Sequence, residues 1–401
     1  MDYPSPAVKE VLERTLGIPI FQEQVMQLAV VAAGFTPGEA DGLRRSMAAW
    51  KRKGGLEHLE QRLIQGMLAR GYAREFAERI YQQILGFGEY GFPESHSASF
   101  ALLAYVSAWL KRHHPAAFLA ALLNSQPMGF YKPAQLVQDA RRHGVEIRQV
   151  DVLASGWECT LEPCADGTPA VRLGLRMVGG LSAAGAARIV SARASGFSSV
   201  EDMMRRAQLD KRELKCLAAS GALEGIAGHR RLAYWQVAGV DTAQHLLCEA
   251  PVHETAPQLA APSEGEGLIH DYASLGLTLG RHPLALLRPR LARMRLATAN
   301  EVRRLPHGSA VRAAGIVIGR QRPDTASGVV FVTLEDETGC VNVIVWRDLG
   351  ERQRCELLSA QLMAVYGSVE RVGEVVHVIA RRLADHSELL GRLATSSRDF
   401  H

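Results

Sequence analysis

The stretch LGLRMVGGLSAAGAARIVSAR, residues 173–193, lies near the middle of the chain and has the pattern of two helices joined by a tight turn. Gly180 and Leu181 would form the turn, and the helix after it carries small residues on its packing side. In such hairpins, turn amides and a helix N-terminus can face a phosphate without reading bases. Glycine usually stands on both sides of the apolar residue, but here Ser182 replaces the second one. Taken alone, the stretch fits a plain helical hairpin equally well.

A second hairpin pattern follows directly. Ser198 and Glu201 have the spacing of a capping box, and residues 209–212 would form the second turn. Two consecutive hairpins favour sequence-independent DNA binding by residues 173–240 over a plain helical pair. The candidate DNA contacts of this tandem helix-hairpin-helix are Gly180, Leu181, Ser182, Arg188, Lys211 and Arg212.

Toward the N-terminus, residues 1–150 are predicted to be almost entirely helical. Thr36 to Glu39 form a capping box with proline at the first helical position, which predicts a helix start. Further helices are expected at 56–70 and 73–85, and residues 151–172 form an extended connector to the hairpins.

The glycine-rich stretch GFGEYGFPESHS, residues 86–97, leads into a long apolar helix that ends at the cations before Pro115. Ser95 can cap this helix. A single histidine at a helix start, such as His96, is more often a structural residue than a functional one.

Toward the C-terminus, residues 305–388 change to the period-two alternation of strands. Five short strands predict a small closed barrel of the OB-fold type, which binds single strands by stacking bases on aromatics beside a positive groove. Residues 241–304, rich in Ala, Pro, Glu and Gly, are interpreted as a linker, and 389–401 as a tail. The strand candidates are VRAAGIVIG (311–319), VVFVTLED (329–336), CVNVIVW (340–346), LMAVYGSVE (362–370) and VVHVIARRL (375–383).

The barrel carries both aromatic and cationic side chains that could contact nucleic acid. Each aromatic taken alone is more often a core residue than a stacking platform. The candidate contacts are Arg312, Arg320, Arg322, Phe331, Trp346 and Arg347.

Composition narrows the class of protein. The net charge is +4, carried by 39 arginines and only 7 lysines. This bias is typical of a GC-rich genome, and it also suits phosphate, which the guanidinium fork binds bidentately. The cysteines and histidines lack metal-ligand spacing, so no structural metal is expected. The longest apolar run is too short for a membrane span, and there is no signal pattern, so a cytoplasmic protein is expected.

Three stretches, residues 21–52, 86–131 and 319–346, resemble in order the bacterial C-family DNA polymerases, the DNA polymerase III alpha subunits. Pro93 and Glu94 stand where the replicative branch tends to have Asn-Lys, which resembles the error-prone, damage-induced branch. The resemblance covers essentially the whole chain. It implies a multidomain, mainly α-helical protein with helical fingers, a tandem helix-hairpin-helix and a C-terminal five-stranded OB barrel.

The resemblance also implies a nucleotide site for dNTP. Arg44 and Arg45 match positions expected to touch the triphosphate of the incoming nucleotide. Ser95, His96 and Ser97 match the segment that lines the nucleotide pocket, where His96 would crowd the sugar 2′ position. A fixed arginine fork suits polyphosphate charge.

The expected partners are a DNA template-primer, single-stranded DNA at the OB domain, and the sliding clamp reached through mutasome adaptor proteins. Residues 244–248 match a clamp motif only poorly. The implied function is translesion DNA synthesis in damage-induced mutagenesis. A catalytically inactive DNA-binding module is the alternative, and RNA binding is a weaker one.

One departure from the family is large. In the family, palm carboxylates hold two metal ions for phosphoryl transfer, but this sequence contains no Asp-x-Asp pair, and Met1 falls within the fingers region. The chain is therefore interpreted as a C-terminal portion that lacks the PHP and palm regions. Mg²⁺ would be held by the missing palm, and we expect the chain alone to be inactive.

Overall fold

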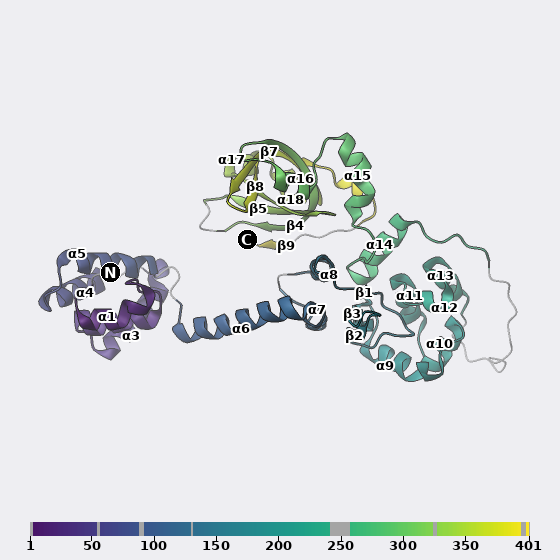
Figure 1. Cartoon of the computed structure of the whole chain (residues 1–401), viewed down its shortest axis with the longest axis horizontal. Helices are drawn as coiled ribbons and strands as arrows, with labels where there is room; N and C mark the ends of the chain where they lie inside the picture. The colour runs from purple at the N-terminus through teal and green to yellow at the C-terminus, as the bar shows by residue number, and fades with distance from the viewer. Residues whose placement is uncertain are drawn as a thin grey trace. The chain divides into compact units, whose positions relative to one another are not determined.

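The computed structural model describes residues 3–53, 57–87, 92–129, 131–240, 257–323, 327–393 and 398–400. The chain divides into two compact units, Met1–Arg112 and His113–His401, and Figure 1 labels many of their helices and strands. The first unit is helical, and the second contains helices and two sheets. The expectation of a multidomain, mainly helical chain with a C-terminal barrel is confirmed.

The first unit is built around a core of apolar side chains that come mainly from its first five helices. The predicted helices at 56–70 and 73–85 are confirmed. So is the capping box, since the Thr36 amide donates to the Glu39 carboxylate at 2.7 Å and the Glu39 amide donates to Thr36 Oγ1 at 3.3 Å. The elements are α1 (Pro6–Leu12), η1 (Glu13–Thr15), α2 (Gln22–Ala33), α3 (Pro37–Lys53), α4 (Glu57–Ala69), α5 (Arg74–Phe87) and α6 (Glu94–His113).

The long helix α6 begins at Glu94, whereas a cap at Ser95 would start it at His96. The Glu94 amide donates to the carboxylate of Glu23 on α2 at 2.9 Å, so an acidic side chain from another helix takes the place of a local cap. The prediction that Ser95 caps this helix is therefore wrong, because Ser95 already lies in the first turn.

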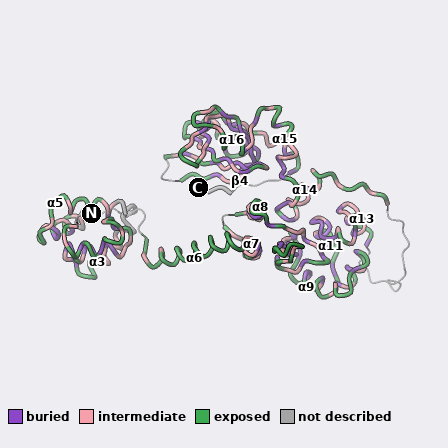
Figure 2. The backbone as a smooth tube through the Cα atoms, in the orientation of Figure 1, coloured by how far each residue is buried: buried purple, intermediate pink, exposed green. Residues whose placement is uncertain are grey.

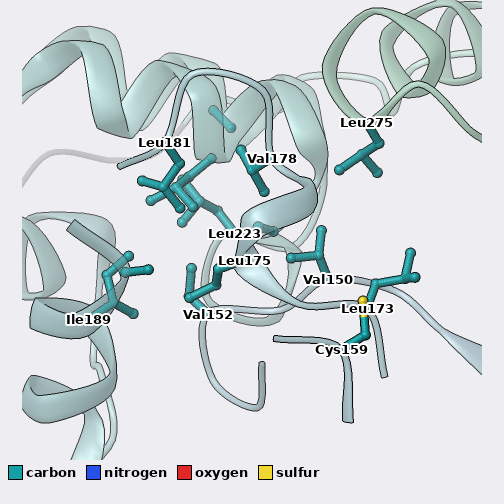
Figure 3. Packing of buried hydrophobic residues seen from close by; sticks show 14 of the residues in the cluster. Val150, Val152, Cys159, Leu173, Leu175, Val178, Leu181, Ile189, Leu223 and Leu275 are labelled. Carbon is teal, nitrogen blue, oxygen red and sulfur yellow. The ribbon is translucent and has the colours of Figure 1, made fainter. Parts of the chain in front are cut away.

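The second unit begins with one continuous core that runs from Ala116 to Leu277. In Figure 3, side chains such as Val150, Leu175 and Leu223, far apart in the sequence, lie in this core. Residues 113–172 thus belong to the same unit as the two hairpins, whereas the sequence placed residues 113–150 with the N-terminal helices. The elements are α7 (Pro115–Asn124), α8 (Pro133–Arg142), β1 (Ile147–Arg148), β2 (Thr160–Pro163), β3 (Pro169–Arg172), η2 (Leu175–Met177), α9 (Ala183–Ala192), η3 (Arg193–Ser195), α10 (Val200–Ala207), α11 (Lys211–Ser220), α12 (Glu224–Ala227) and α13 (Arg230–Gly239).

The C-terminal sheet closes into a five-stranded barrel, as predicted. Its order is β5-β6-β8-β7-β4, and an additional β5–β4 pairing closes it. The β6–β8 pair is parallel, whereas the other pairs among these five strands are antiparallel. Residues 398–400 of the expected tail form β9, which pairs with β4. The elements are β4 (Ala310–Gln321), β5 (Val330–Asp336), β6 (Gly339–Val345), α17 (Arg347–Arg352), α18 (Arg354–Ser359), β7 (Leu362–Val372), β8 (Val375–Asp385), η5 (Ser387–Leu390) and β9 (Arg398–Phe400).

The predicted linker 241–304 is largely structured. Residues 241–256, with the weak clamp-motif match at 244–248, lie outside the described residues. The rest forms α14 (Glu264–Leu275), α15 (Pro283–Arg293) and α16 (Ala299–Arg304), with buried leucines packed against the barrel. Its first and last helices begin with capping boxes, at Ser263 and Thr298. The linker interpretation was wrong here because it relied on composition and not on these start signals.

Buried His282 makes the stability of this part of the molecule depend on pH. Its Nδ1 accepts a hydrogen bond from the Leu284 amide at 3.1 Å, and burial lowers the pKa of its imidazole from 6.5 to about 4. Because the unfolded chain binds this proton more readily, stability is lost as pH falls from about 6.5 to about 4, by roughly 3 kcal/mol. The variant His282→Asn keeps a side-chain acceptor for the Leu284 amide but does not titrate in this range. Denaturant titrations should therefore show a much smaller drop in its free energy of unfolding between pH 7 and pH 4.5 than in the parent. An equal loss in both proteins would refute this role.

Candidate nucleic-acid interface

The arginine pair predicted to touch the triphosphate lies on α3 and is organised by one acidic residue. Arg44 donates to Asp41 Oδ1 from Nε at 3.0 Å and from Nη2 at 2.8 Å, and Arg45 Nε lies 3.2 Å from Asp41 Oδ2. The two side chains are 40% and 70% exposed, so both guanidinium groups keep donors for a further acceptor. Sequence reasoning missed Asp41, although its i,i+3 and i,i+4 spacing to the arginines could have revealed it.

The segment Ser95 to Ser97 lies in the first turn of α6. The His96 ring packs against Phe100 one turn later, with centroids 4.4 Å apart, and Ser97 Oγ donates to the Pro93 carbonyl at 3.2 Å. Arg14 of η1 binds the carboxylate of Glu94 with both terminal nitrogens. The helix start is therefore fixed on the first unit, and the exposed imidazole is oriented by its neighbour. No hydrogen bond, ion pair or ring contact among the described residues joins this segment to Arg44 or Arg45.

The first hairpin has the predicted turn but not the predicted first helix, which is only the single 3₁₀ turn η2. Gly180 has φ +88°, and a Cβ there would meet Cys216 Sγ at 3.0 Å, so the turn requires glycine. Leu181 is buried in the core and Ser182 caps α9, accepting from the Gly185 amide at 2.9 Å. The Gly179 amide is already bonded to the carbonyl of Ser274 on α14 at 2.8 Å.

The second hairpin is joined to the first through Glu213. Arg188 donates to Glu213 at 2.8 Å and to the Ala207 carbonyl at 2.9 Å, so it bridges the hairpins. Gln208 has φ +49° at the turn, and Asp210 caps α11. The predicted Ser198–Glu201 box is wrong by one residue.

The helix α10 that precedes this turn starts at the next serine. Its cap is Ser199, which accepts from the Asp202 amide at 3.0 Å, while the Ser198 amide donates to the Asp202 carboxylate at 3.1 Å. The sequence SSVED offers two overlapping Ser-x-x-acid spacings, so spacing alone does not decide between them.

A basic pocket opens beside the second hairpin. Lys211 and Arg212, both predicted contacts, line it together with Lys215 one turn further along α11. All three side chains are exposed, and Lys211 Nζ also donates to the Ala238 carbonyl at 3.3 Å. The i,i+4 spacing could have revealed Lys215, but the facing residues come from α13 and α14 and carry no local signal. The other lining residues are Gly179, Cys216, Ala219, Tyr234, His270, Ala273 and Ser274.

Two of the predicted barrel aromatics are exposed. Phe331 on β5 is 36% exposed, and Trp346 at the end of β6 is 56% exposed. Phe331 pairs with Ile344 in the sheet, and Trp346 follows Val345, the last residue of β6, as the N-cap of α17. Each exposed ring offers a surface on which a base could stack.

The predicted barrel arginines divide into structural and surface groups. Arg320 is 6% exposed and donates to the carbonyls of Leu357 and Ala360, each at 2.6 Å, so it ties β4 to α18 rather than facing solvent. Arg312 lies over the Tyr366 ring at 5.8 Å. Arg322 and Arg347, with Arg354, line a pocket at the end of β4, and Arg347 also pairs with Glu351 at 2.8 Å.

The described residues include no group of three or more histidine, cysteine, aspartate or glutamate side chains that could hold a metal ion. In the same part of the chain, no helix has the length and apolar character needed to cross a membrane.

Comparison with known proteins identifies both helical regions. Residues 1–71 match the finger domain of the bacterial DNA polymerase III alpha subunit, and residues 144–233 match a helix-hairpin-helix motif. The chain is 61% identical over 402 residues to an error-prone DNA polymerase of Alkalilimnicola ehrlichii, covering 100% of this chain and 39% of that protein. It is 62% identical over 400 residues to an error-prone DNA polymerase of Azoarcus sp., covering 98% of this chain and 38% of that protein. The chain thus spans well under half the length of these relatives.

Proposed function

Because the chain belongs to the family of the bacterial DNA polymerase III alpha subunits, in its error-prone branch, we propose that it supplies nucleotide and DNA contacts to a DNA-directed DNA polymerase that acts in translesion synthesis. The observation that carries this proposal is the similarity to error-prone DNA polymerases along its whole length. Such similarity favours a working part of a polymerase over an inactive DNA-binding remnant.

At the nucleotide, Arg44 and Arg45 present two guanidinium groups to the triphosphate, held in place by the shared carboxylate of Asp41. Their exposed donors suit bidentate contacts with phosphate oxygens. His96, packed on Phe100, stands at the sugar and excludes a 2′-hydroxyl by its bulk. DNA polymerases generally use Mg²⁺, which neutralises phosphate charge. The described residues do not fit a metal site, so we assign the metal to polypeptide outside this chain.

At the DNA, the basic pocket on α11 contacts backbone phosphates of the template-primer. Phe331 and Trp346 stack bases of a single strand beside the cations of the barrel. We also propose that the polymerase reaches the sliding clamp through mutasome adaptor proteins and that it acts in the cytoplasm. These last features rest on the family alone.

We expect binding of this chain to duplex DNA to weaken steeply with salt, because phosphate contacts release counterions. A plot of the logarithm of the binding constant against the logarithm of salt concentration has a negative slope, to which each phosphate contact contributes about −0.9. The double variant Lys211→Gln, Lys215→Gln should make this slope less steep by about 1–2. Fluorescence anisotropy at several salt concentrations measures this slope. The matched control, Lys9→Gln with Arg74→Gln, removes two exposed charges from the first unit and should leave it unchanged. A flat salt response of the parent chain would refute electrostatic DNA binding.

A further inference from the structure

The helix α6 has the composition of a core helix, but it is exposed along its described length. None of its residues is buried, and Figure 2 shows it as exposed over most turns. Between Glu94 and Lys111 it carries no carboxylate, lysine or arginine. Its exposed large apolar side chains include Phe100 (57%), Leu102 (65%), Leu103 (58%), Tyr105 (71%), Val106 (44%) and Leu110 (37%).

Helical spacing places these side chains over a wide face. Leu102 and Val106 are one turn apart at its centre, and Leu103, Tyr105 and Leu110 flank them on both sides. On the opposite face, Ala101, Ala104 and Ala108 are spaced three and four residues apart. Their small side chains would let a second helix or strand approach closely. A helix that is apolar all round is normally buried inside a larger structure. An exposed apolar surface of this extent marks an interaction site.

The length of the relatives indicates which polypeptide covers the apolar surface of α6. The error-prone polymerase of Alkalilimnicola ehrlichii matches this whole chain with only 39% of its length, so it has a large complementary segment outside the match. We propose that this complementary segment covers α6 and makes it a core helix of the complete polymerase. The inference rests on the family relationship behind the proposed function, and not on nucleotide or DNA contacts. Because His96 lies on the same helix, docking would also place the complementary segment beside the sugar-facing residue.

Co-expression tests this directly. This chain and the complementary segment of the Alkalilimnicola ehrlichii polymerase, each with its own tag, should co-purify at equal stoichiometry. Amides of α6 should gain hydrogen-exchange protection in the complex. The double variant Leu102→Asp, Val106→Asp should weaken the association at least tenfold, whereas Val372→Asp, at a 71% exposed apolar position on β7, should not.

Four results would overturn the inference. They are no association, association that the α6 variant does not weaken, dimers of this chain alone that the same variant dissolves, and a loss of thermal stability in the isolated α6 variant well beyond the helix-propensity effect of two aspartates, since the face would then already be buried. DNA binding by the chain alone should be the same for the variant and the parent. If the parent chain did not bind DNA at all, that result would instead count against the proposed function.

Discussion

Replacing both Arg44 and Arg45 by alanine should lower kcat/KM for dNTP incorporation by about 10²–10⁴-fold in a chimera that joins this chain to the complementary segment. A charge-assisted hydrogen bond contributes about 1.5–3 kcal/mol, and each guanidinium would lose its contact with the triphosphate. The Asp41 carboxylate contacts both guanidinium groups, so it would orient them before a nucleotide binds. Single-turnover primer extension over a range of dNTP concentrations measures the effect.

The control for this experiment is Arg74→Ala, which removes an exposed arginine of the same unit that pairs with Glu78. It should leave kcat/KM unchanged. In the same assay, the arginine variant should keep the ratio of dNTP to rNTP incorporation, while His96→Ala should lower that ratio. If the arginine variant kept full activity, Arg44 and Arg45 would be surface residues without a role at the triphosphate. An unchanged ratio in His96→Ala would leave His96 as a structural residue.

Gly66→Ala should destabilise the first unit by about 2–3 kcal/mol, through overpacking between α2 and α4. A Cβ at position 66 would lie 2.1 Å from the Ala33 carbonyl oxygen, and backbone at a helix end cannot move aside as a flexible side chain can. Arg62, one turn earlier on α4, already donates to the same carbonyl at 3.3 Å. Hydrogen exchange of the α2 and α4 amides measures the local loss.

The matched control is Gly42→Ala on α3. A Cβ there would meet nothing within 4 Å. Replacing glycine inside a helix by alanine favours folding by up to about 1 kcal/mol. The two substitutions should therefore change protection in opposite directions. Equal protection in both variants would show that α2 and α4 do not approach as closely as the structure has them.

The sequence predicted those helices and strands whose patterns, such as period-two alternation or a capping box, are complete within a few consecutive residues. The period-two runs gave all five barrel strands, and the capping box at Thr36 gave the start of α3. The helices α14 and α16 also carried such signals, at Ser263 and Thr298, but a composition rich in Ala, Pro, Glu and Gly obscured them. In this segment the capping boxes mark the helices, whereas the overall composition does not.

The candidate site was less predictable because its contacts are distant in sequence. Arg320 alternates like a surface residue, yet its acceptors lie 37 and 40 positions away. The basic pocket on α11 is closed by residues of α13 and α14, which only the tertiary structure brings together. Conversely, α6 is exposed although its sequence is apolar, and this difference is the observation behind the proposed docking surface.

The most direct test of the proposed function is primer extension with Mg²⁺ and dNTP, comparing this chain alone, the complementary segment alone, and the two together. We expect no extension by either part alone and extension by the mixture, because the proposed nucleotide and DNA contacts lie in this chain, whereas its described residues include no group of side chains that could hold a metal ion. Extension by this chain alone would contradict the assignment of the metal site to other polypeptide. An inactive mixture, under conditions in which the intact Alkalilimnicola ehrlichii polymerase extends the same primer, would contradict the proposed function.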